Sequence, residues 1–167
     1  MPNQGKQQGQ SNRGGGTHHG SRPFNQGGDD KGKNKKSEDD FRSDYKQVWG
    51  NQFGEILKPE KTDYNTYINT LKKYVSGKFR NGNTDLSASQ LRNIFFDVRK
   101  VKEVKELYPL RPKLAYAAGR ADKDAVKEVM QLFDDLMANV KTQDELKSFQ
   151  DFFEAIIAYH KFYGGKN

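Results

Sequence analysis

The chain has 167 residues, no cysteine and a formal net charge of +7. Its length predicts one domain, and the lack of cysteine excludes disulfides, thiolate chemistry and zinc–sulfur sites. No stretch approaches the roughly 18–20 apolar residues of a membrane span, and the N-terminus lacks the apolar core of a secretory signal. We therefore expect a cytoplasmic protein that does not enter a membrane.

The N-terminal segment has the composition of a disordered tail. The first 40 residues contain only two hydrophobic side chains, Met1 and Phe24, and nine of the 16 glycines fall within the first 32 residues. Such a segment cannot bury enough apolar surface to offset its conformational entropy. The sequence therefore predicts a disordered Gly/Gln/Asn-rich tail over residues 1–40 and a folded helical domain over residues 41–167.

The positive charge is concentrated in the first part of that domain. Residues 58–120 carry 14 basic and 6 acidic side chains, a net charge of +8, whereas residues 121–167 have a net charge of −3. Such asymmetry is typical of a protein with a polyanionic partner such as a nucleic acid. An ordinary basic surface is the alternative that charge alone leaves open.

The apolar residues recur at helical spacing along the whole domain. Residues 41–57 favour a short helix or an ordered lead-in, which Pro59 ends. The further predicted helices span residues 62–76, 88–107, 112–119, 122–140 and 143–163. Gly77 is the expected cap of the first of these, and Thr142 with Glu145 forms a T-x-x-E capping box for the last. The predicted fold class is all-α, a compact bundle of about five helices.

A basic edge is expected on the helix over residues 88–107. At 100° per residue, Arg92 and Arg99 fall together beside the apolar stripe, and Phe96 falls on the same edge. These side chains can grip a phosphate backbone or a partner subunit. Two arginines lying over a packed phenylalanine explain the pattern equally well.

The chain lacks the side chains that catalysis requires. His160 is the only histidine outside the tail, no arginine stands five residues before it, and no serine lies in a G-x-S-x-G context. Asp134 and Asp135 are expected on a solvated helix face rather than in a catalytic site. No phosphate-binding glycine loop is present. We expect no enzyme activity, no cofactor and no metal, which leaves binding.

Three segments together resemble one known family. They are Ser89–Arg92 (SQLR), Leu110–Arg120 (LRPKLAYAAGR) and Glu154–Lys166 (EAIIAYHKFYGGK). In this order and spacing they resemble the small helical subunit of the type III-A CRISPR effector, the Csm complex. The resemblance covers about residues 64–167, and the long tail departs from it, because members of the family usually begin near the first helix.

The resemblance implies a non-catalytic subunit of an antiviral ribonucleoprotein. Copies of such a subunit stack head to tail into an inner filament along the duplex of guide RNA and target RNA. The implied partners are therefore the two RNA backbones, copies of the chain itself, the large cyclase/nuclease subunit and the repeated backbone subunit. By motif position, Arg92, Lys113 and Arg120 are the expected phosphate contacts. Arg99 follows from the edge pattern, and Lys161 is expected to contact RNA or a neighbouring subunit.

Three other functions remain open on sequence grounds. A structural spacer would use the same arginines for salt bridges to neighbouring subunits. A small RNase of toxin type is disfavoured by the missing Arg–His pair. A free-standing RNA chaperone would act through the glycine-rich tail, so deletion of that tail would abolish its activity but leave an effector subunit nearly unchanged.

Overall fold

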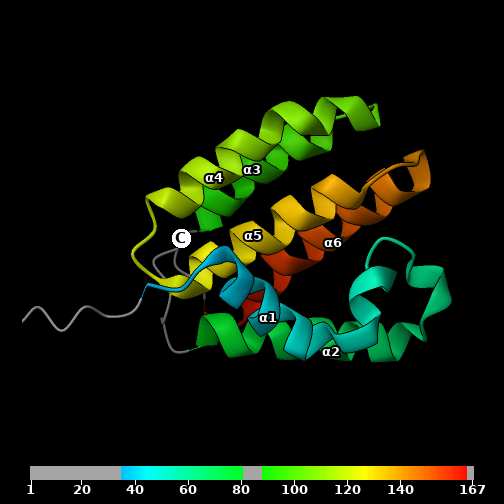
Figure 1. The fold of residues 1–167 in the computed structure, drawn as a ribbon. Helices are drawn as coiled ribbons and strands as arrows, with labels where there is room; N and C mark the ends of the chain where they lie inside the picture. Colours follow the sequence, from blue (N-terminus) through cyan, green and yellow to red (C-terminus); the bar gives the residue numbers. More distant parts are fainter. Residues whose placement is uncertain (1–34, 81–87, 165–167) are drawn as a thin grey trace, which may run out of the picture. The chain divides into compact units, whose positions relative to one another are not determined.

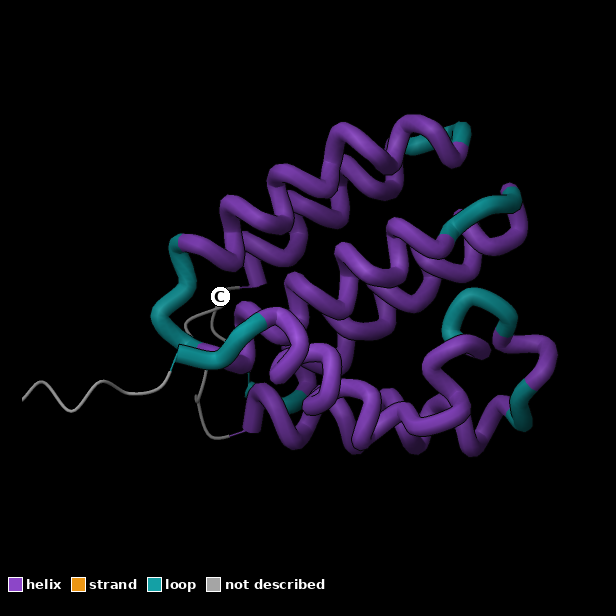
Figure 2. The backbone as a smooth tube through the Cα atoms, viewed as in Figure 1, coloured by secondary structure: helices purple, strands orange, loops and turns teal. Residues whose placement is uncertain are grey.

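The computed structural model describes residues 35–80 and 88–164, and every regular element in these two ranges is helical (Figure 2). The α-helices are α1 (Glu38–Trp49), α2 (Tyr64–Phe79), α3 (Ala88–Lys100), α4 (Arg111–Gly119), α5 (Asp124–Asn139) and α6 (Gln143–Phe162). Short 3-10 helices span Gly50–Glu55 (η1), Pro59–Lys61 (η2) and Val104–Leu110 (η4). The predicted all-α class is confirmed. Most of the predicted tail and the final Gly165–Asn167 lie outside the described residues.

The six α-helices form two layers of three. In one layer α5 lies between α4 and α1, and in the other α6 lies between α3 and α2 (Figure 1). The core fills the space between α5 and α6, where the rings of Phe133 and Phe153 lie 3.8 Å apart between centroids. Trp49 joins this core from α1 and meets Phe152 edge to face at 5.5 Å. Helices α3 and α4 therefore sit at the same edge of the two layers.

Capping boxes set where two of the described α-helices begin. The predicted box before α6 is confirmed, since the Thr142 side chain accepts a hydrogen bond from the Glu145 N–H and the Glu145 carboxylate accepts one from the Thr142 N–H. Ser37 and Asp40 form a similar box before α1. Because this box satisfies the first backbone N–H groups, α1 begins at Glu38, inside the segment predicted as tail.

Two helix ends differ clearly from the sequence prediction. Helix α2 continues through Gly77 to Phe79, because Phe79 is buried and packs edge to face on buried His160, with ring centroids 4.6 Å apart. Helix α3 ends at Lys100 instead of continuing to Leu107. After Lys100 the chain leaves the helix and enters η4. The Glu106 side chain accepts a hydrogen bond from the Glu103 N–H in the capping box that begins η4.

The expectation that Asp134 and Asp135 lie on a solvated face is wrong. Asp134 accepts two hydrogen bonds from the Arg111 guanidinium, at 2.7 and 2.8 Å. Asp135 accepts hydrogen bonds from Arg42 at 2.9 and 3.3 Å and from the hydroxyl of buried Tyr45. The two carboxylates join α5 to its neighbours on either side, a role that the helical wheel of α5 alone cannot show.

Candidate nucleic-acid interface

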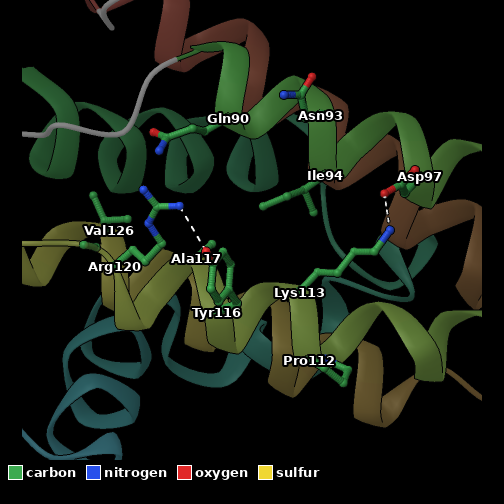
Figure 3. Close-up of a pocket in the computed structure, with 11 residues that line it drawn as sticks. Gln90, Asn93, Ile94, Asp97, Pro112, Lys113, Tyr116, Ala117, Arg120 and Val126 are labelled. Carbon is green, nitrogen blue, oxygen red and sulfur yellow. Dashed lines mark hydrogen bonds and ion pairs between the residues drawn. The ribbon is translucent and has the colours of Figure 1, made fainter.

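A groove separates α3 from α4 at the edge of the bundle (Figure 3). It has a volume of about 610 Å³ and a mixed lining of apolar side chains, amides, cations, the Asp97 carboxylate and an exposed tyrosine. Lys113 and Tyr116 line it from α4, Arg120 lines it from the position directly after α4, and Gln90 and Asn93 line it from α3. The spacing of three and four residues brings the α4 side chains to one face. The groove therefore presents hydrogen-bond donors and positive charge beside an aromatic ring.

Two of the five predicted site residues lie in this groove. The Lys113 ammonium is 2.6 Å from the Asp97 carboxylate of α3, an exposed pair that closes one end of the groove (Figure 3). The Arg120 guanidinium donates a hydrogen bond to the Tyr116 hydroxyl at 3.0 Å and lies 5.5 Å from the centre of that ring. Within residues 35–80 and 88–164 no carboxylate pairs with Arg120. Arg120 is therefore the more available of the two cations.

The structure places Arg92 and Arg99 together, on the other side of α3. Both line a hollow between α3 and α6, and Phe96 lies between them, with 62% of its surface exposed. Arg99 lies 5.9 Å from the centre of the Phe95 ring and 3.8 Å from the Glu154 carboxylate. Because the two arginines are exposed, their charge is open to a ligand.

Lys161, the fifth predicted residue, stands apart from these two groups. It is exposed near the end of α6 and lines neither the groove nor the hollow.

The sequence prediction missed a set of cations on the α2–α6 face. The Lys72 ammonium lies 5.7 Å from the centre of the Tyr159 ring, and the Arg80 guanidinium lies 5.7 Å from that of Tyr163. Arg80 directly follows α2, where a cation complements the helix dipole and so has a structural explanation on the sequence alone. The sequence does contain several basic residues in α2 and tyrosines near the end of α6. These two groups can be recognised as neighbours only once it is known that α2 packs on α6.

The part of the chain that the structure describes holds neither a cluster of metal ligands nor a membrane-spanning helix. In it no three histidine or carboxylate side chains gather as metal ligands. No helix there combines the length and the apolar character needed to cross a bilayer.

Fold and surface define a small, basic, all-helical protein in which four of the five predicted site cations lie on the two sides of one helix, α3. A family model described as Csm2 Type III-A matches residues 68–166. The chain is also 32% identical over 120 residues to the "CRISPR system Cms protein Csm2" of Streptococcus thermophilus, covering 64% of this chain and 97% of that protein. No solved structure matches the chain significantly. The chain belongs to the Csm2 type III-A family, that of the small subunit of the type III-A Csm complex.

Proposed function

We propose that this chain is a non-catalytic subunit of the type III-A CRISPR ribonucleoprotein and contacts the backbone of the guide RNA–target RNA duplex. The proposal rests on the exposure of three cations around one helix, α3. Arg92 projects from one side of α3, and Lys113 and Arg120 lie in the groove on its other side. None of these three side chains contributes to the core. The fold presents them to solvent from both sides of α3, as a phosphate contact requires.

Contact with the backbone suits a complex that must accept any guide. Base pairing reads the sequence, so the protein needs only positive charge along the phosphates. Lysine and arginine supply that charge without discriminating bases. Several copies along one duplex would together bind it tightly through avidity, even if each copy binds weakly. Copies of the chain, the large subunit and the repeated backbone subunit are the partners that this arrangement requires.

A binding role also fits the placement of His160. This imidazole is fully buried beside Phe79, so it has no access to a substrate at the surface. We further propose that the part of the predicted tail that precedes the Ser37–Asp40 capping box is not needed for this role and that the helical domain carries it, in the cytoplasm.

The test uses the complete complex, purified from its host through a tag on this chain. The Arg92→Ala/Arg120→Ala variant is compared with Lys46→Ala, which removes an exposed cation on α1. We expect the double variant to assemble normally but to retain target RNA less well, with a weaker dependence of affinity on salt, because fewer counterions are released. Unchanged affinity and salt dependence in the double variant would refute the proposal.

A spacer role is the second candidate, favoured by one observation. Lys113 already pairs with Asp97 at 2.6 Å, so part of the cationic surface is neutralised within the chain. If the arginines bind neighbouring subunits instead of RNA, Arg92→Glu will disrupt assembly and leave the RNA affinity of the remaining complexes intact.

A further inference from the structure

The hollow between α3 and α6 is lined mainly by apolar side chains. Its volume is about 330 Å³. The exposed ring of Phe96 stands at its side, and Phe95, Ile157 and Ala158 add further apolar surface. Leaving a phenylalanine mostly in water forgoes the gain of burying it, about 25 cal/mol for each Å² of apolar surface. The exposed ring is therefore available to a partner that can cover it.

The charges around the hollow indicate which partner that is. Arg92 precedes Phe96 by one helical turn and Arg99 follows it by almost one turn, so both lie on the same edge of α3. Within the described residues Arg92 forms no ion pair, and Arg99 is only loosely paired with exposed Glu154. An aromatic ring between two available arginines fits a ligand that combines a flat ring with negative charge.

We propose that this hollow binds an unpaired nucleotide of RNA, with its base stacked on Phe96 and its flanking phosphates held by Arg92 and Arg99. The inference rests on the proposed RNA-binding function and adds a contact to a base. Stacking on aromatic side chains is sequence-tolerant, because every base has a π-face. It therefore does not conflict with a subunit that must accept any guide.

An unpaired nucleotide fits this site better than a duplex does. The bases of a duplex are stacked on one another, so their faces are closed to Phe96 and only the backbone can reach the arginines. A single-stranded segment, a bulge or a strand end offers a free base face together with its phosphates. The hollow thus adds a base contact at Phe96 to the backbone contacts that we propose for the cations on both sides of α3.

The test compares binding of the full-length chain to single-stranded oligouridylate and to duplex RNA of equal length, by fluorescence anisotropy. Phe96→Ala should weaken affinity for the single strand about fivefold or more, the usual size of a lost stacking contact, and leave duplex affinity unchanged. Phe96→Trp should retain single-strand binding. Tyr64→Ala is the matched control, since Tyr64 is 70% exposed on α2 and does not line the hollow.

A second readout is the position of a photo-crosslink from 4-thiouridine in the same oligonucleotide. We expect it on the α3 segment around Phe96 and expect its loss in Phe96→Ala. If the wild-type chain binds RNA but Phe96→Ala binds the single strand unchanged, or loses both RNA forms equally, the stacking site is refuted and the proposed function stands. If the Arg92→Ala/Arg120→Ala variant also leaves RNA affinity and its salt dependence unchanged, both the stacking site and the proposed function are refuted.

Discussion

Helices α5 and α3 use charge in opposite ways. Three carboxylates on α5 each hold a cation from a different neighbouring helix. The pairs are Glu128 with Lys78 of α2 at 2.5 Å, Asp134 with Arg111 of α4 at 2.7 Å and Asp135 with Arg42 of α1 at 2.9 Å. On α3, by contrast, Arg92 and Arg99 project from an exposed edge.

The difference is one of burial. Only 3% of the Glu128 side chain and 17% of the Asp135 side chain are exposed, against 66% of that of Arg99. A buried charge without its partner is costly, whereas exposed ion pairs contribute about 0–1 kcal/mol. The α5 pairs therefore fix the positions of the helices, and the α3 cations can be lost without loss of fold. This contrast separates structural cations from those that we propose to bind RNA.

Removing Lys78 should give the largest loss of stability. Burial raises the pKa of the Glu128 carboxyl, even though Lys78 opposes the shift, so the charged form is already costly there. Lys78→Ala leaves that carboxylate without its cation, and we expect the free energy of unfolding to fall by about 3 kcal/mol. Urea denaturation followed by circular dichroism measures the change.

The matched control for this prediction is Lys73→Ala, on the exposed side of the same helix. It should change the stability by less than about 0.5 kcal/mol. The Lys78→Ala/Glu128→Gln double variant should recover part of the loss, because a neutral amide needs no cation. If Lys78→Ala is as mild as Lys73→Ala, the α5 pairs are not structural and the contrast with α3 fails.

Asp135→Asn should have a smaller effect, one that depends on pH. Burial alone would raise the pKa of Asp135, but hydrogen bonds from Arg42, Tyr45 and Gln131 outweigh burial and hold the pKa below its ordinary 3.8. A depressed pKa adds stability that is present above about pH 3.8 and is lost as the pH falls through the folded-state pKa. We expect the variant to lose about 2 kcal/mol at pH 7, measured by urea denaturation, and progressively less below pH 3.8.

The control is Asp39→Asn, which removes an exposed partner of the same Arg42. The Asp39 side chain is 92% exposed and lies 3.1 Å from that guanidinium. Its loss should cost less than about 0.5 kcal/mol at any pH. A cost of Asp135→Asn that stays constant from pH 7 to pH 3 would show that the charge of this carboxylate does not stabilise the fold.

The sequence predicts the parts of this molecule that depend on local spacing. Period and capping residues place α4, α5 and α6 nearly at their observed bounds, and the wheel of α3 puts Arg92 beside Arg99. The pattern fails where distant segments meet. Asp134 and Asp135 look solvated on the wheel of α5, because nothing in that stretch shows that Arg42 and Arg111 will reach them from other helices.

The candidate site divides in the same way. Position in the three motifs selects Lys113 and Arg120, which the structure brings into one groove. It does not show that Lys113 is already paired with Asp97, since these two residues are 16 positions apart on different helices. Whether a cation is free to bind a ligand depends on the tertiary contacts of its side chain. The sequence alone predicts only the helix on which it lies and the face of that helix.

The exposed pair on the α3–α6 edge gives the smallest expected effect and the most direct test of the contrast. Glu154 lies 3.8 Å from Arg99, with 57% and 66% of the two side chains exposed. Glu154→Ala should therefore change the free energy of unfolding by less than about 0.5 kcal/mol. It should also raise RNA affinity, because Glu154 is the one carboxylate, among the residues that the structure describes, that competes with phosphate for Arg99. The opposite result is a fall in the free energy of unfolding of more than about 1 kcal/mol, with no gain in RNA affinity. That result would mean that the charges of α3 stabilise the fold, as those of α5 do.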